Sequence, residues 1–198
     1  MKISKLILLA LSLVSLCACT PPATPTATQE HYFDLSASDI AKQEVLIAIT
    51  DEEELQYGAR VAYLNQQGDT IIPFGKYAYL GSDTLVYFAN VMEFPNDSSY
   101  GKWIAIDQQQ RVLYDIVAID NGPDYFQEGL VRVKRNEKMG FANQYGQVVI
   151  PCAYDFVGWF EAGKAKVALK AQAIKEGEHT RIEAEEWFFI DKQGQRIH

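Results

Sequence analysis

The fold of this 198-residue chain is decided by the stretch Gly140-Phe141-Ala142-Asn143-Gln144-Tyr145-Gly146-Gln147-Val148-Val149-Ile150-Pro151. An apolar strand runs into Asn143, a polar turn ends at Gly146, and a second apolar strand follows. Asn at the first position of a type I turn accepts a hydrogen bond from the backbone two residues on, and Gly at the fourth takes a positive φ without steric cost. Followed by a bulge, such a turn closes a β-hairpin. The stretch therefore predicts two antiparallel strands.

The same pattern occurs three more times along the chain. Segments 63–73, 105–113 and 189–197 each carry an apolar strand into a turn that starts at Asn65, Asp107 or Asp191. The turn residues lie 42, 36 and 48 positions apart, so the repeating unit is about 40 residues long. Gln110 stands where the other turns have Gly, and we expect a cost of about 1 kcal/mol for its backbone there.

A second shared piece links two of these units. Phe126-Gln127-Glu128-Gly129 and Phe160-Glu161-Ala162-Gly163 each precede a run that alternates between apolar and basic residues. This alternation is typical of half-buried strands. The apolar face contains Val131, Val133, Ala165, Val167 and Leu169, and the outward face contains Arg132, Lys134, Lys164 and Lys166. If the two strands pair, these four basic residues form a stripe that is a possible partner-binding face. The alternative is a solvated sheet face whose charges prevent edge-to-edge pairing.

The quoted stretch, continued by Tyr154, Phe160 and Gly163, resembles a WG (KWG) repeat. In such repeats a Trp-Gly pair, a strand, a turn ending in Gly, a second strand and a Pro are followed by a Tyr and a Phe-x-x-Gly. Lys138-Met139-Gly140 takes the Lys-Trp-Gly position, and Tyr57-Gly58 and Tyr100-Gly101 are the equivalents in earlier units. The resemblance covers residues 55–198 and implies β-hairpin repeats without established catalytic residues. We therefore expect a mainly β fold, an antiparallel meander of about 3.5 diverged WG-type units with a short N-terminal helix.

The remaining elements complete the expected organisation. Ser36-Ala37-Ser38-Asp39 resembles a capping box that starts a short helix near 35–43, and 45–49 reads as a strand. Residues 164–191 read as one long hairpin before the terminal one. The expected divisions are a signal peptide (1–18), a lipidated Cys with a Pro/Thr tether (19–30), a helix and strand cap (31–54) and the β-repeat domain (55–198).

The N-terminus predicts a lipid anchor. Lys2 and Lys5 precede an apolar run, and Leu16-Cys17-Ala18-Cys19 resembles the lipobox of bacterial lipoproteins, with Cys19 as the modified residue. The resemblance implies a diacylglycerol on Cys19, and transfer to the outer rather than the inner membrane if the source is Gram-negative. Plain secretion and an uncleaved anchor are the alternatives. The Pro-rich segment 20–30 is expected to be an extended tether.

The charge and the cysteine content limit which classes of partner and of covalent cross-link the protein can have. Removal of residues 1–18 takes away two lysines and changes the formal net charge from −8 to −10. Such an acidic chain argues against nucleic acid, because phosphate binding needs a basic footprint. Once Cys17 has left and Cys19 carries the lipid, only Cys152 remains, so no internal disulfide is available. We expect Cys152 to be a buried structural thiol rather than a nucleophile.

Signs of catalysis are few. His31, His179 and His198 form no zinc-binding pattern, and no nucleophile elbow or phosphate loop occurs, so no cofactor and no metal are expected. The acidic run 51–54 reads as a solvated turn rather than a cation site. Asp115 with Asp120 or Asp124 is a candidate pair for glycosidic-bond hydrolysis.

Two hypotheses about function remain open. The favoured one is a non-enzymatic cell-envelope lipoprotein whose β-repeat domain binds a protein or glycan, and the alternative is an envelope hydrolase that uses paired carboxylates in a groove. Aromatic residues in the strands are expected to pack in the core, and the alternative is that they stack on sugars or anchor a partner. They are Trp103, Tyr154, Trp159, Phe160, Trp187, Phe188 and Phe189.

Overall fold

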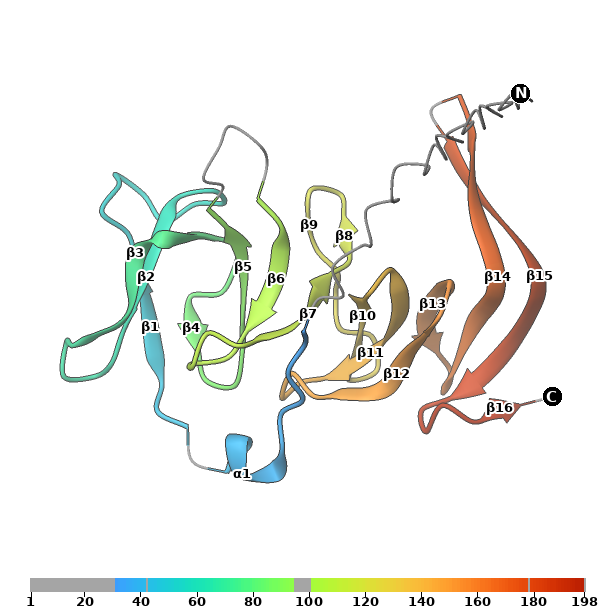
Figure 1. Ribbon diagram of the computed structural model, residues 1–198, viewed down its shortest axis with the longest axis horizontal. Coiled ribbons are helices and arrows are strands. Elements are labelled where there is room, and N and C mark those ends of the chain that lie inside the picture. The colour runs from blue at the N-terminus through green and yellow to red at the C-terminus, as the bar shows by residue number, and fades with distance from the viewer. Residues whose placement is uncertain (1–30, 42, 95–100, 178, 198) are drawn as a thin grey trace, which may run out of the picture.

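The computed structural model describes residues 31–41, 43–94, 101–177 and 179–197. Strands make up 58% of the residues and helix makes up 3%, which confirms the predicted mainly β fold class. In Figure 1 the strands form a row of antiparallel hairpins, from β1, β2 and β3 at one end of the long axis to the long β14–β15 hairpin at the other. The predicted signal peptide, Cys19 and the tether lie outside the described residues.

The elements are short except for two strands near the C-terminus. In chain order they are α1 (Ala37–Ile40), β1 (Leu46–Ile49), β2 (Arg60–Leu64), β3 (Thr70–Tyr79), β4 (Thr84–Leu85), β5 (Ala89–Glu93), β6 (Trp103–Ile106), β7 (Val112–Ile116), β8 (Ala118–Ile119), β9 (Gly122–Pro123), β10 (Leu130–Arg135), β11 (Lys138–Asn143), β12 (Val148–Tyr154), β13 (Phe156–Glu161), β14 (Lys164–Glu176), β15 (His179–Asp191) and β16 (Arg196–Ile197). The sheet orders are β12-β11-β10-β7-β6-β5-β3-β2-β1-β4, β13-β14-β15-β16 and β8-β9.

All four predicted turns are present. The backbone N–H of the fourth residue donates to the carbonyl of the first in each turn, as in the bond of 2.9 Å from Gly146 to Asn143. The Asn143 side chain accepts from the N–H of Tyr145, which is the expected capping of the turn. Gln110 takes φ +63° at the position that Gly occupies in the other turns. The turn at Asp107 therefore has the same backbone conformation as the others, although its fourth residue is not glycine.

The two Phe-x-x-Gly pieces form the same kind of turn. Glu128 and Gly129 both have positive φ, and so do Ala162 and Gly163. Two successive positive φ values define a two-residue type I′ hairpin turn, whose twist matches that of the flanking strands. The two pieces are thus similar in sequence because they share a backbone conformation. Each turn is followed by a strand that contains basic residues, β10 after the first and β14 after the second.

The glycine of the Lys-Met-Gly motif permits a close approach between strands. A Cβ at Gly140 would lie 2.4 Å from the carbonyl oxygen of Ile150 on β12. At Gly101, in the preceding unit, a Cβ would lie 1.6 Å from the carbonyl oxygen of Glu93. Both distances are far below van der Waals contact, so only glycine allows the backbones to pass. This requirement is the physical reason for a glycine at that repeat position.

The N-terminal segment lies across the middle of the long sheet. Ser36 caps α1 with both bonds of the predicted capping box. The N–H of Phe33 donates to the carbonyl of Val112 at 2.8 Å, and Arg135 donates to the carbonyl of Phe33 and to the Asp34 carboxylate. The helix is shorter than predicted, with four residues, and the carbonyl of Leu35 before it accepts a hydrogen bond from the Gln147 side chain instead of continuing the helix. β1, the predicted 45–49 strand, joins the sheet between β2 and β4.

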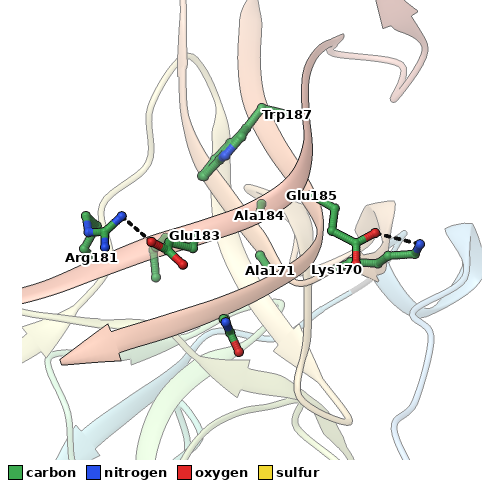
Figure 2. A pocket seen from close by; sticks show the side chains of 9 residues that line it. Lys170, Ala171, Arg181, Glu183, Ala184, Glu185 and Trp187 are labelled. Atoms are coloured by element: carbon green, nitrogen blue, oxygen red, sulfur yellow. Dashed lines mark hydrogen bonds and ion pairs between the residues drawn. The ribbon is translucent and has the colours of Figure 1, made fainter.

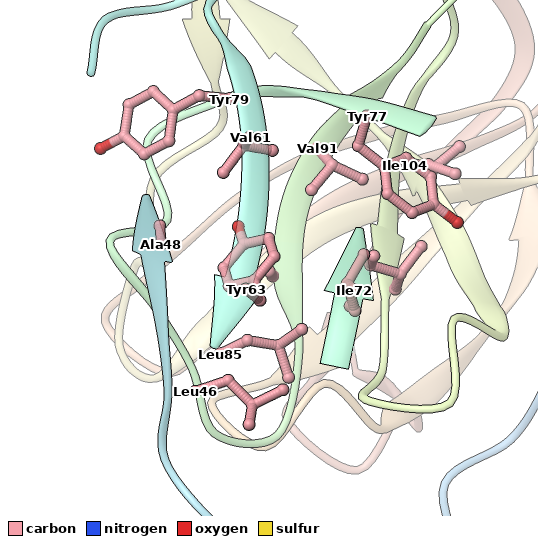
Figure 3. Packing of buried hydrophobic residues seen from close by; sticks show 12 residues of the cluster. Leu46, Ala48, Val61, Tyr63, Ile72, Tyr77, Tyr79, Leu85, Val91 and Ile104 are labelled. Carbon is pink, nitrogen blue, oxygen red and sulfur yellow. The ribbon is translucent and has the colours of Figure 1, made fainter. Parts of the chain in front are cut away.

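Three clusters of buried side chains stabilise the fold. The first fills the N-terminal half of the long sheet around Tyr63 and Leu46 (Figure 3). The second, around Phe141 and Phe160, joins the long sheet to the four-stranded sheet. The third, around Leu113 and Val133, lies beneath the N-terminal segment. Burial of apolar area in these clusters is the main driving force for folding, and it fixes the four-stranded sheet beside β10 and β11.

Candidate functional site

The predicted stripe of four basic residues does not form, because its two strands lie in different sheets. β10 pairs with β7 and β11, whereas β14 pairs with β13 and β15. The outward orientation predicted for Arg132 is also wrong, since this residue is only 7% exposed. Lys134 is half-buried on the same strand. Lys164 and Lys166 are exposed on β14 as predicted.

Arg132 instead forms a buried ion pair with Asp124, and both residues contact Trp159. Its Nε lies 2.7 Å from Oδ2 of Asp124, and its Nη2 lies 3.2 Å from Oδ1. The indole N–H of Trp159 donates to Oδ1 of the same carboxylate at 2.9 Å, and the guanidinium lies 4.2 Å from the Trp159 ring centre. Two charge-assisted bonds compensate for desolvation of the ion pair. These contacts fix the orientation of Trp159.

Trp159 nevertheless remains largely accessible. It is 47% exposed, although its N–H is bonded and its ring is stacked on Arg132. A β-bulge explains its position, because Val157 pairs with Val167 and Phe160 with Ala165. Gly158 and Trp159 are thus the two residues that oppose Lys166. The bulge places an exposed, oriented indole beside a lysine of the neighbouring strand.

The two lysines of β14 lie over aromatic rings of β15. Nζ of Lys166 is 4.4 Å from the ring centre of Trp187, and Nζ of Lys164 is 5.0 Å from that of Phe189. Lys166 pairs with Phe189 in the register. Because side chains alternate along a strand, these four share the face opposite to buried Val167. We call these four residues, together with Trp159, which lies opposite Lys166 in the register, the basic-aromatic face.

Lys164 and Lys166 differ from most basic residues in the charges around them. Ion pairs with carboxylates engage most described arginines and lysines, including Arg60, Arg111 and Lys138. Neither Lys164 nor Lys166 has such a pair among the described residues, and the rings beneath them supply only weak cation–π attraction. In a chain of net charge −8, these two ammonium groups are open to an anionic group from outside.

A shallow groove continues from this face along the β14–β15 hairpin (Figure 2). Its volume is about 680 Å³. Trp187, a member of the basic-aromatic face, is also one of the residues that line the groove. Ion pairs of Lys170 with Glu185 and of Arg181 with Glu183 flank it. Sequence reasoning predicted the hairpin but not the groove, since the side chains that line it come together only through the pairing of β14 with β15; Lys170 takes φ +50° there, and the register is the same on both sides of it. The remaining lining residues are Ala171, Gln172, Ile182 and Ala184.

The carboxylates considered for hydrolysis have other partners. Asp115 pairs with Lys102 at 2.9 Å and accepts from the Tyr32 hydroxyl at 2.8 Å. Asp124 is held by Arg132, as described above, and Asp120 lies in the exposed β8–β9 turn with φ +45°. Each of the first two is kept in a structural ion pair rather than presented to a substrate.

The other aromatic residues considered as a stacking surface mostly pack inward. Phe160 is buried against Phe141, with ring centres 4.8 Å apart. Tyr154 and Phe188 are half-buried and in edge contact with each other, and Trp103 is half-buried on β6. The expectation of core packing is thus confirmed for Phe160, whereas Trp159 and Phe189 are exposed.

Cys152 has the environment of a structural thiol. It is partly buried on β12, and its Sγ lies 3.9 Å from the carbonyl oxygen of Val133. Burial raises the pKa of the thiol to about 11, so almost none of it is thiolate at neutral pH.

The described part of the chain has neither a metal-ligand cluster nor a membrane-spanning helix. In that part of the chain no three His, Cys, Asp or Glu side chains gather as metal ligands would. None of the helices described there has the length and apolar character to cross a membrane. The acidic run 51–54 is an exposed bend in which Asp51 and Glu52 pair with Arg60.

Comparison with known proteins gives one similarity. No curated protein and no solved structure matches the chain. The family described as WG containing repeat matches residues 139–170, which run from β11 through the first half of β14. The chain therefore contains a WG-type repeat at 139–170, the stretch that includes Trp159, Lys164 and Lys166.

Proposed function

We propose that this protein is a non-enzymatic lipoprotein of the cell envelope whose β-repeat domain binds a protein or glycan through the basic-aromatic face. One observation carries the binding site: Lys164 and Lys166 lie over aromatic rings without a carboxylate partner in the part of the chain that the structure describes, and Trp159 is exposed nearby. Exposed aromatic and basic groups that converge on one face are typical of binding surfaces. Ion pairing of Asp115 and Asp124 supports binding over hydrolysis.

The lipid anchor is proposed at Cys19, on the strength of the Leu16-Cys17-Ala18-Cys19 motif. Two or more acyl chains on one residue give durable membrane attachment, whereas a single chain does not. In a Gram-negative source, the outer membrane is the expected location. The test is metabolic labelling with an alkyne-bearing fatty acid, followed by membrane fractionation. We expect the wild-type protein to be labelled and Cys19→Ser to be unlabelled and soluble. A membrane-bound Cys19→Ser protein would contradict the anchor.

The binding role is tested by affinity capture from envelope extracts. The bait is the wild-type protein or a Lys164→Glu/Lys166→Glu variant, and Lys175→Glu is the matched control because Lys175 is exposed on the same strand. We expect the same ligand to be recovered with wild type and with the control, and to be lost with the double variant. Equal recovery with all three baits would refute the proposed face.

A further inference from the structure

We propose that the ligand of the basic-aromatic face is an acidic polysaccharide, a polymer of carboxylate-bearing sugars. This inference rests on the proposed binding function and deepens it by naming the ligand class. Three properties of the face support it: aromatic rings held in place, ammonium groups with no carboxylate partner among the described residues, and an open groove that shares Trp187 with the face.

The rings are ready to stack before any ligand arrives. Trp159 and Phe189 are 47% and 40% exposed, and Asp124 and Arg132 hold the indole of Trp159 in place. A side chain that is already ordered loses little conformational entropy on binding. The C–H groups on one side of a pyranose ring form a flat apolar surface that packs on an aromatic ring. Arg132 lies over one side of the Trp159 ring and Lys164 over one side of the Phe189 ring, so a sugar ring would contact the exposed remainder of each.

Lys164 and Lys166 would favour an acidic ligand over a neutral one. Lys166 is opposed in the register by Phe189 and by the Gly158–Trp159 bulge, so no carboxylate lies directly across from it. Lys164 is opposed by Glu161 and Asp191, but the Asp191 carboxylate accepts from backbone N–H groups of its own turn. A carboxylate on a stacked sugar would form a charge-assisted hydrogen bond with Lys166. The acidic remainder of the chain would disfavour other positions for a polyanion.

The shape of the surface favours a glycan over a peptide. A bound peptide usually pairs with a sheet edge, which β13 provides outside the groove, or needs apolar pockets for its side chains. The groove beyond Trp187 is instead shallow, and Lys170, Gln172, Arg181, Glu183 and Glu185 line it with hydrogen-bonding groups. Hydroxyl groups of a sugar polymer can exchange hydrogen bonds with such groups along the hairpin. An extended chain of acidic sugars would thus run from the stacked rings into this groove.

The experiment uses the full chain in detergent micelles and three probes of similar length. They are a tetramer of galacturonic acid, a neutral galactose tetramer and a tetraglutamate peptide. Binding is measured by calorimetry and by tryptophan fluorescence. We expect the acidic tetramer to bind, with an affinity that falls as salt rises. Lys166→Gln should weaken it roughly tenfold or more, since one charged hydrogen bond is lost. Lys175→Gln should leave it unchanged.

Each contrary result is informative. Absence of binding by the galacturonate tetramer, equal binding of the neutral tetramer, or an unchanged affinity of Lys166→Gln would overturn the acidic-polysaccharide inference. Tighter binding of tetraglutamate that Lys166→Gln abolishes would also overturn it, yet would leave the proposed binding function standing with a protein partner. Thermal unfolding of each variant controls for folding, and the exposed position of Lys166 makes the substitution compatible with the fold.

Discussion

Substitution of Gly140 by Ala should strongly destabilise the protein. The new Cβ would lie 2.4 Å from the carbonyl oxygen of Ile150, 2.8 Å from the N of Cys152 and 2.8 Å from the carbonyl carbon of Pro151. All three atoms are backbone, so β12 must move away from β11 by roughly 1 Å. Loss of two ladder hydrogen bonds costs about 2 kcal/mol, and the overpacking adds about 1–3 kcal/mol. We expect the free energy of unfolding to fall by about 3–5 kcal/mol.

The assay is urea unfolding followed by tryptophan fluorescence, with Gly158→Ala as the matched control. Gly158 lies in β13, and a Cβ there would meet its nearest atom, the carbonyl oxygen of Lys166, at 3.4 Å, which is ordinary contact. We expect the control to change the free energy of unfolding by less than about 0.5 kcal/mol. Equal losses in the two variants, or no loss for Gly140→Ala, would refute the idea that a close strand approach requires the motif glycine.

Three further predictions concern buried groups. Tyr114→Phe should leave the free energy of unfolding unchanged or raise it by about 1 kcal/mol, because the buried Tyr114 hydroxyl has no hydrogen-bond partner among the described residues. Tyr63→Phe should lower it by about 1 kcal/mol, because the Tyr63 hydroxyl donates to a backbone carbonyl. Denaturant unfolding of both variants checks the sign, and an equal change in both would count against this difference between the two hydroxyls. Arg132→Met should cost about 3–5 kcal/mol by leaving the Asp124 carboxylate buried and unpaired; adding Asp124→Leu should recover part of that loss in the same assay, and no recovery would show that the ion pair is not the cause. Cys152 should resist alkylation below its pKa of about 11 and react quickly once unfolded, as mass spectrometry with and without urea would reveal; rapid labelling of the folded protein at pH 8 would argue against a buried thiol.

The hairpins could be predicted from the sequence because the residues that determine each turn are neighbours in the chain. Asn143 and Gly146 determine a turn through bonds within four residues, so no knowledge of distant partners is needed. The two Phe-x-x-Gly pieces were recognised for the same reason. Local chemistry likewise predicted the Ser36 capping box.

Arg132 illustrates what a single sequence does not reveal. Its alternation with Val131 and Val133 is typical of an outward basic residue, and the pattern is the same around Lys166. The difference arises from the Asp124 carboxylate, which the fold brings to Arg132 on β10 and not to Lys166 on β14. The assignment of β10 and β14 to separate sheets depends on such long-range contacts, which residue patterns do not record.

The most direct test of the central claim is photocrosslinking in cells that produce the protein. A benzophenone amino acid replaces Phe189, within the basic-aromatic face, or Val149, an equally exposed apolar residue on β12 that serves as the control. Irradiation should join a ligand to position 189 and none to position 149, and Lys166→Gln should reduce the yield at 189. Adducts of equal yield at both positions, or none at 189, would contradict a binding role for this face.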